Sequence, residues 1–290
     1  MAMTYGDMWR RLAAAYGEGE AKAIARRVFE TRFGLSLADI CCGKADSMAG
    51  SEAEELEAMT ERLAGGEPVQ YVLGVETFGG REFSVAPGVL IPRPETEELC
   101  SLVAEDCRLR GVSVADGQVG SPLRLLDIGT GSGCIAVTLA LDVRDAEGTA
   151  WDISPQALEM ARTNARRLGA SVTFEERDAL HPPHDAERWD VIVSNPPYIC
   201  EREKTGMERN VLDHEPHLAL FVPDSDPLLF YRAIVNYGLK ALKRGGRLWF
   251  EVNAAYAGDT AAMLQSAGYA DAEVLTDSFG RPRFIKATKT

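Results

Sequence analysis

The sequence predicts an α/β protein in which a mostly parallel sheet, covered by helices, follows a small all-helical domain and a β-hairpin linker. From residue 123 onward, short apolar runs alternate with helical segments, which is the pattern of a parallel sheet with both faces covered. Residues 1 to about 73 show only the apolar spacing of helices. Between these parts, Gly79-Gly80 separates two strand-like runs. A length of 290 residues agrees with two domains.

The first part, residues 1–74, is expected to form a helical domain that recognises the substrate. Its apolar residues recur at helical spacing, as in Ala21, Ile24 and Val28. Ser51 followed by Glu54 is the capping-box pattern that begins a helix. The segment contains no acid–base pair and no glycine loop suited to chemistry, so recognition or support is its expected role.

A hairpin linker is expected over 75–92, and the remaining residues, 93–290, should form the α/β domain. The strand candidates in it are 123–128, 148–152, 171–175, 190–194, 247–252, 271–275 and 283–287. Helices are expected from about residue 95 and over 155–168, 227–243 and 255–267. The last two strands have no helix between them, so one edge of the sheet should be an antiparallel hairpin.

Composition and charge exclude several classes of protein. The 31 Lys and Arg against 44 Asp and Glu leave a net charge of −13, which argues against binding to nucleic-acid backbones. No apolar run approaches the length of a membrane span, and the N-terminus does not read as a secretory signal. The six cysteines form no C-x-x-C pair, so we expect free thiols in a reducing compartment, the cytoplasm. The four histidines flank prolines in two pairs, and no metal site is predicted.

A glycine-rich loop follows the first strand of the expected sheet. Asp127 closes that strand, and the loop has the spacing G-x-G-x-G, which differs from the pattern that seats a pyrophosphate. Asp127 would repel phosphate but suits an ammonium group. Asp152 ends the next strand, where such sheets place the carboxylate that binds a ribose diol. Asp178 and Ala179 follow the third strand, where an adenine edge would lie.

These features together favour S-adenosylmethionine over NAD or ATP as the ligand, since they provide for ribose, adenine and an amino-acid group but not for phosphate. The residues expected to bind it are Asp127, Gly129, Thr130, Gly131, Ser132, Gly133, Asp152, Asp178, Ala179 and Asn195. The alternative is structural: the glycines could serve packing alone, and Asp152 could only cap the following helix.

The run Asn195-Pro196-Pro197-Tyr198, directly after the fourth strand, is the most specific signal and supplies the expected catalytic residues. The prolines have no N–H, so the turn presents carbonyl acceptors without competing donors. The Asn195 side chain adds another acceptor, and Tyr198 offers a ring for stacking. Two converging acceptors suit an NH₂ group, either of a glutamine amide or of adenine, and the motif alone does not decide between them.

With these motifs, the chain resembles the bacterial release-factor glutamine methyltransferases (PrmC, also called HemK). The resemblance covers nearly the whole chain, and the runs that carry it are 67–74, 83–85, 90–97, 127–133, 193–199, 215–216 and 219–220. The run Ile91-Pro92-Arg93-Pro94-Glu95-Thr96-Glu97 is specific, since adenine methyltransferases that share Asn-Pro-Pro-Tyr do not generally carry it.

The resemblance implies a seven-stranded class I S-adenosylmethionine-dependent methyltransferase domain of Rossmann-like type, preceded by five helices and a hairpin. It implies methylation of the glutamine amide nitrogen in the Gly-Gly-Gln tripeptide of class-one peptide-chain release factors, which would be the partners. By position, Asn195 would contact both the methyl donor and the glutamine. Ala179 stands where some relatives carry an aromatic residue.

Three other functions are compatible with parts of the pattern. A sister enzyme could methylate a glutamine of a ribosomal protein with nearly the same pocket. An adenine methyltransferase acting on nucleic acid would need a basic groove and base flipping, which the acidic charge disfavours. A donor-binding module without activity would be expected to have lost Asn195 or Tyr198, and both are present.

Overall fold

The computed structural model describes residues 3–110 and 122–290 of the chain. These residues divide into two compact units. The first comprises Met1–Val75 together with Met207–Glu215, and the second comprises Glu76–Gly206 together with Pro216–Thr290. Each unit has its own hydrophobic core, so each is described by itself.

The first unit is helical. It contains α1 (Tyr5–Phe33), α2 (Leu37–Cys41), η1 (Lys44–Ser47), α3 (Ser51–Ala64), α4 (Val69–Leu73) and α8 (Arg209–His214). A capping box between Thr4 and Asp7 begins α1. Gly17, with φ 75° and ψ 163°, interrupts α1 with a kink, because only glycine adopts that backbone conformation at little cost. Buried side chains of α1 and α3, among them Leu12, Phe29 and Leu56, form its core.

The hairpin lies where the Gly-Gly pair predicts it. β1 (Val75–Phe78) and β2 (Arg81–Ser84) form a two-stranded sheet, and Gly79 and Gly80 have φ angles of 58° and 69°. Two successive positive φ angles are the requirement of a tight hairpin turn. Phe78 and Phe83 stack edge to face and join a core cluster of the second unit.

The second unit is built on a seven-stranded sheet with the order β10-β11-β9-β6-β3-β4-β5. Its strands are β3 (Leu123–Ile128), β4 (Ala146–Asp152), β5 (Val172–Glu176), β6 (Trp189–Ser194), β9 (Leu242–Glu251), β10 (Tyr269–Thr276) and β11 (Pro282–Lys289). The pairs from β5 through β9 are parallel, whereas β11 pairs antiparallel with both β9 and β10. The predicted seven strands and antiparallel edge are confirmed.

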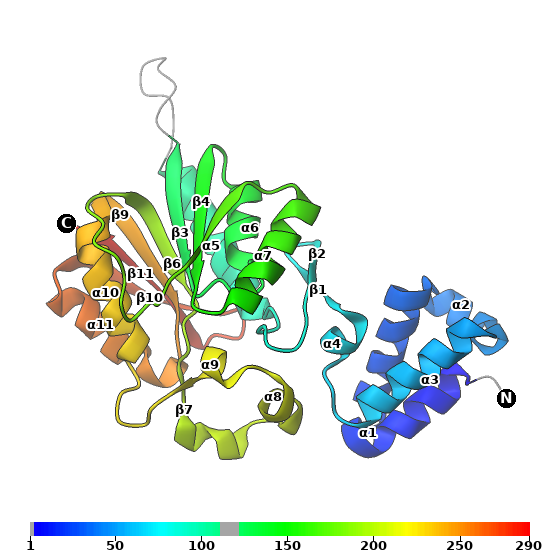
Figure 1. Cartoon of the computed structure of the whole chain (residues 1–290). Coiled ribbons are helices and arrows are strands. Elements are labelled where there is room, and N and C mark those ends of the chain that lie inside the picture. The colour runs from blue at the N-terminus through cyan, green and yellow to red at the C-terminus, as the bar shows by residue number, and fades with distance from the viewer. Residues whose placement is uncertain (1–2, 111–121) are drawn as a thin grey trace. The chain divides into compact units, whose positions relative to one another are not determined.

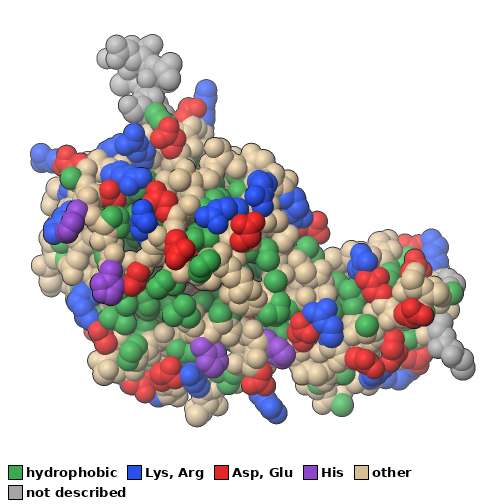
Figure 2. Space-filling model, viewed as in Figure 1, with side chains coloured by type: hydrophobic (Ala, Val, Ile, Leu, Met, Phe, Trp, Pro, Cys, Tyr) green, Lys and Arg blue, Asp and Glu red, His purple; other side chains and the backbone are tan. Residues whose placement is uncertain are grey.

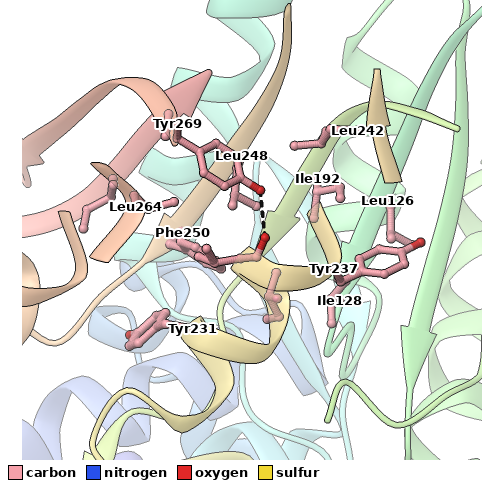
Figure 3. Close-up of a cluster of buried hydrophobic side chains, with 14 of the residues drawn as sticks. Leu126, Ile128, Ile192, Tyr231, Tyr237, Leu242, Leu248, Phe250, Leu264 and Tyr269 are labelled. Atoms are coloured by element: carbon pink, nitrogen blue, oxygen red, sulfur yellow. Dashed lines mark hydrogen bonds between the residues drawn. The ribbon is translucent and has the colours of Figure 1, made fainter. Parts of the chain in front are cut away.

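Helices cover both faces of this sheet (Figure 1). One face carries α5 (Pro94–Leu109), α6 (Cys134–Asp142) and α7 (Pro155–Leu168), and the other carries α10 (Leu229–Ala241) and α11 (Ala257–Ser266). Successive residues of each central strand therefore enter different cores: Leu125 packs toward α5 and α6, whereas Leu126 packs toward α10. Figure 3 shows the second of these cores, in which the Tyr269 hydroxyl donates to the main-chain oxygen of Val235 at 3.0 Å.

Several short helices and strands lie between β6 and α11 along the chain. They are β7 (Ile199–Cys200), η2 (Glu201–Gly206), α9 (His217–Leu220), β8 (Phe221–Val222) and η3 (Ala254–Tyr256), and β7 pairs with β8 in a small separate sheet. The helix predicted over 227–243 is shorter than expected, because β9 already begins at Leu242. Within the described ranges, none of the helices has both the length and the apolarity needed to span a membrane.

Candidate active site

A cavity of about 370 Å³ lies at the carboxyl ends of the parallel strands in the second unit. The chain runs from β3 outward to β4 and β5 and then returns to β6 on the other side of β3. Such a reversal of strand order opens a crevice in which α/β sheets bind ligands. The walls come from segment 88–93, from the turns after β3, β4, β5 and β6, and from α9 and α10. Hydrophobic side chains gather on this part of the surface (Figure 2).

The glycine loop after β3 forms one wall, with Gly129, Thr130, Gly131 and Ser132 lining the cavity. The main-chain N–H groups of Gly129 and Thr130 both donate to the carbonyl of Trp151, each at 2.9 Å. Gly129 and Gly131 have φ angles of 78° and 56°, which a residue with a Cβ adopts only with strain. At these two glycines the loop therefore contributes only main-chain atoms to the cavity wall.

Gly133, predicted to bind the donor, does not line the cavity. Its φ is 84°, and a Cβ added there would lie 3.0 Å from the Cβ of Ala161. This glycine lets α6 begin close against α7, so its role in the structure is packing.

Asp127, also predicted to contact the ligand, is fully buried behind the loop and is absent from the cavity wall. Its Oδ2 accepts hydrogen bonds from the Thr130 hydroxyl at 2.6 Å and from the Ala136 N–H at 3.2 Å, whereas Oδ1 is without a partner among the described residues. Burial raises the pKa of Asp127 to about 7, although these hydrogen bonds oppose the rise. In this structure Asp127 organises the loop instead of facing the ligand site.

Asp152 lies at the end of β4 and lines the cavity as predicted. One carboxylate oxygen accepts from the N–H of Gly131 at 2.8 Å and the other from the N–H of Ser154 at 2.9 Å. Each oxygen keeps a further lone pair, so the carboxylate can still accept from a ligand diol. Burial raises the pKa of Asp152 above its ordinary value. The helix cap itself is Ser154, whose hydroxyl accepts from the N–H of Ala157.

Asp178 and Ala179, after β5, both line the cavity. Asp178 accepts from the N–H of Leu180 at 2.8 Å and lies 2.6 Å from Nδ1 of His181. Ala179 packs its side chain against the core shared with α10. The cavity wall therefore has a small apolar side chain at Ala179 and a polar side chain beside it at Asp178.

The turn after β6 forms the wall next to the glycine loop. The hydroxyl of Ser194 donates to the carbonyl of Ile128 at 2.6 Å and ties the ends of β6 and β3 together. Asn195, Pro196 and Pro197 then line the cavity, and the Nδ2 of Asn195 donates to the hydroxyl oxygen of Thr96 at 3.1 Å. The predicted acceptor groups are thus brought to the same hollow as the glycine loop.

Tyr198 lies elsewhere than predicted. It is not among the residues that line the cavity; its ring packs against the core, and its hydroxyl donates to Oε1 of Glu251 at 3.0 Å. Burial, and next the Glu251 carboxylate, raise the pKa of Tyr198 above its ordinary range, so the hydroxyl keeps its proton. The structure shows Tyr198 as an anchor of the turn and not as a stacking platform.

Two residues of this region were not among the predicted site residues. Thr96, in the first turn of α5, lines the cavity and donates to Oε2 of Glu251 at 2.7 Å. Glu251 is the last residue of β9 and only 1% exposed. The signal that could have found Glu251 is its position, a carboxylate at the end of a parallel strand beside β6.

Cys134 and Ile135, at the start of α6, complete the wall beneath the loop. Burial raises the pKa of the Cys134 thiol to about 12. In the portion of the chain that the structure describes, no three His, Cys, Asp or Glu residues come together as a metal site would require.

Comparison with known proteins relates the chain to methyltransferases. Residues 118–215 match the model of the methyltransferase small domain, and residues 8–74 match that of the PrmC N-terminal domain. A release factor glutamine methyltransferase of Bacteroides thetaiotaomicron is 46% identical over 94% of this chain and 95% of its own length, and one of Flavobacterium psychrophilum is 36% identical over 95% and 94%. The crystal structure of a release factor-specific protein-(glutamine-N5) methyltransferase from Alicyclobacillus acidocaldarius is 28% identical with a TM-score of 0.41, covering 71% of this chain and 99% of that one.

Proposed function

The chain belongs to the release factor glutamine methyltransferase family, and from this premise we propose that it methylates the glutamine of the Gly-Gly-Gln motif in class-one peptide-chain release factors. The methyl group would come from S-adenosylmethionine and go to the side-chain amide nitrogen. The observation that carries the proposal is that Asn195 and the glycine loop line one hollow.

The cavity fits the methyl donor in size and in the chemistry of its walls. Its volume of about 370 Å³ lies in the ordinary range for small-ligand sites. The carboxylate of Asp152 has lone pairs free for a ribose diol, and the small Ala179 leaves room beside Asp178 for the adenine. The glycine loop would approach the amino-acid part through its backbone. S-adenosylmethionine, when bound, supplies an electrophilic methyl carbon on its sulfonium.

The turn after β6 would hold the nucleophile. The Oδ1 of Asn195 and the main-chain oxygen of Pro196 are the two acceptors proposed for the hydrogens of the glutamine NH₂. An amide nitrogen is a poor nucleophile because its lone pair is delocalised, so alignment with the methyl carbon is the main contribution the chain can make. The nitrogen becomes positive as its bond to carbon forms and the carbon–sulfur bond breaks, and the same acceptors then bind its hydrogens more strongly.

No strong base is needed before the attack, because the nitrogen loses its proton only after it has become cationic. The proton leaves to water, and the sulfur departs as the neutral thioether S-adenosylhomocysteine. This step needs no metal ion.

The choice between a release factor and a ribosomal protein rests on the relatives. The named relatives act on release factors, and the match covers residues 8–74 of the helical unit, which we propose as the substrate-recognition domain of this chain, with 75–92 as the linker and 93–290 as the methyltransferase domain. A nucleic-acid substrate is disfavoured by the net charge of −13.

The test is methyl transfer to competing substrates. Purified protein would be incubated with methyl-labelled donor and, separately, a release factor, the same factor with Gln→Ala in its Gly-Gly-Gln motif, ribosomal proteins and DNA. We expect label only on the unmodified release factor, located by mass spectrometry at the glutamine. Label on a ribosomal protein or on DNA, without label on the release factor, would overturn the proposal.

A further inference from the structure

A buried chain of hydrogen bonds ends on the side-chain amide of Asn195. We propose that Thr96 and Glu251 are positioning residues, which hold this amide with Oδ1 toward the substrate and Nδ2 away from it. The inference rests on the proposed function for its consequence in catalysis, but the arrangement itself is a property of the folded chain.

The chain crosses three elements of the second unit. Nδ2 of Asn195, after β6, lies 3.1 Å from Oγ1 of Thr96 on α5, and this oxygen lies 2.7 Å from Oε2 of Glu251 at the end of β9. Tyr198 reaches the other carboxylate oxygen of Glu251 at 3.0 Å. Thr96 is 3% exposed and Glu251 1% exposed, so water does not compete for these groups.

With Glu251 ionised, the number of available hydrogens determines the direction of every bond. An ionised carboxylate only accepts, so the single hydroxyl hydrogen of Thr96 goes to Glu251. The Thr96 oxygen then offers only lone pairs to Asn195, which must turn its NH₂ toward Thr96. The carbonyl oxygen of Asn195 is therefore directed to the other side, toward the cavity that this residue lines.

Two donors face the carboxylate of Glu251. Each of its oxygens receives one donor, and the main-chain oxygen of the same residue accepts separately from the Tyr231 hydroxyl at 3.2 Å. Burial, the largest effect, raises the pKa of Glu251 above its ordinary value, and the bonds from Thr96 and Tyr198 together with the Arg283 guanidinium oppose this rise.

The orientation matters because the two ends of an amide have opposite hydrogen-bonding character. With Oδ1 forward, Asn195 accepts a hydrogen of the substrate NH₂. With Nδ2 forward, it would present hydrogens to hydrogens, and the acceptor that strengthens as the nitrogen becomes cationic would be lost. A substitution at Thr96 or Glu251 that fails to hold this orientation would leave Asn195 in place but weaken its hydrogen bond to the substrate NH₂.

Four variants test this assignment. Thr96→Val keeps the shape but removes the hydroxyl, and Thr96→Ser restores it. Glu251→Gln replaces one acceptor oxygen by a donor, which allows the Thr96 hydrogen to turn toward Asn195. Thr138→Val is the matched control, because Thr138 is equally buried at 3% exposed, does not line the cavity, and its hydroxyl has no partner in the described part of the chain.

We expect kcat for release-factor methylation to fall about 10- to 100-fold in Thr96→Val and Glu251→Gln, up to the effect of losing one transition-state hydrogen bond. Thr96→Ser should stay within about threefold of the wild type, and the Kd of the donor for each variant should match that of Thr138→Val. A kcat for Thr96→Val equal to that of Thr138→Val would overturn the assignment, as would a Thr96→Ser variant as slow as Thr96→Val.

A second readout does not depend on the substrate. In ¹⁵N-labelled protein, the side-chain NH₂ signals of Asn195, identified by their loss in Asn195→Ala, should exchange slowly with solvent in the wild type and in Thr96→Ser, and rapidly in Thr96→Val. Equal exchange in all three would refute the network. A wild-type protein that shows slow exchange but labels no release factor would contradict the proposed function alone.

Discussion

The two turns that form adjacent walls of the cavity are supported in opposite ways. The glycine loop after β3 is held by main-chain hydrogen bonds and by Asp127, which lies in the strand immediately before it. The turn after β6 has two prolines and few N–H groups, and it is held by side chains, Thr96 and Glu251, from elements far away in the sequence.

Each turn therefore has a buried carboxylate behind it, but the two carboxylates act differently. Asp127 holds a backbone in a shape that fits a ligand, so its loss should first affect stability and donor binding. Glu251 orients a side chain that we propose contacts the reacting nitrogen, so its loss should first affect turnover. Stability and turnover are thus the two measurements that separate the turns.

The largest effect is expected from the pH dependence of Asp127→Asn. The Asp127 pKa of about 7 lies above its ordinary 3.8, so between these values the folded chain binds a proton that the unfolded chain has lost. The stabilising effect of this proton is complete below pH 4 and is lost as the pH rises through 7. The free energy of unfolding of the wild type, relative to Asp127→Asn, should fall by up to about 4 kcal/mol across this range.

Chemical denaturation of both proteins at pH values from 4 to 8.5 measures this difference, in which all other titrating groups cancel. A difference that does not change with pH would mean that Asp127 is ionised throughout.

The next largest effect is expected from Asn195→Ala, which removes the proposed acceptor. Turnover should fall at least ~100-fold, which corresponds to about 2.7 kcal/mol, because an interaction that strengthens in the transition state is lost. Single-turnover kinetics on a release factor, with the Kd of the donor measured by calorimetry, would show whether donor affinity falls less than turnover. Near-normal turnover would remove Asn195 from its assigned role.

A smaller effect, on stability, is expected from Gly133→Ala compared with Gly169→Ala. Both glycines have positive φ angles, 84° and 74°, so both substitutions carry similar backbone strain. Only at Gly133 would the new Cβ meet another residue, Ala161, at 3.0 Å. Gly133→Ala should therefore lower the free energy of unfolding by about 2 kcal/mol more than Gly169→Ala, as overpacking does. Urea denaturation tests this, and equal losses would show that crowding at Gly133 is relieved.

The smallest effect is expected from Tyr198→Phe, which removes one of the two donors to Glu251. The ring still fills its place, so the cost is that of one buried hydrogen bond, about 1–2 kcal/mol in the free energy of unfolding. Turnover should fall less than in Asn195→Ala. A variant as inactive as Asn195→Ala would instead give the Tyr198 hydroxyl a direct role in the reaction.

Much of the fold could be predicted because its signals are local. The alternation of strands and helices and the Gly-Gly turn at Gly79-Gly80 each follow from a few neighbouring residues. The start of β9 was harder to predict, since Lys243, Arg244, Gly245 and Gly246 show no strand pattern although β9 already begins at Leu242.

The same distinction applies to the site. The sequence predicted Gly129, Asp152 and Asn195 on the cavity wall, because strand ends and turn residues can be identified in the sequence. Asp127, Gly133 and Tyr198 were also expected at the ligand, but they do not line the cavity. Their positions are determined by contacts with residues behind the cavity wall. Glu251 and Thr96 are separated by 155 positions, so only the folded sheet brings them together.

The burial of Cys134 has a consequence for an enzyme of this class. Cys134 lines a cavity proposed to hold an alkylating reagent, and a thiolate is a far better nucleophile than an amide. With its pKa near 12, only roughly one Cys134 in ten thousand is a thiolate at pH 8. In the proposed reaction, this burial would favour methyl transfer to the weakly nucleophilic amide over transfer to the Cys134 thiol.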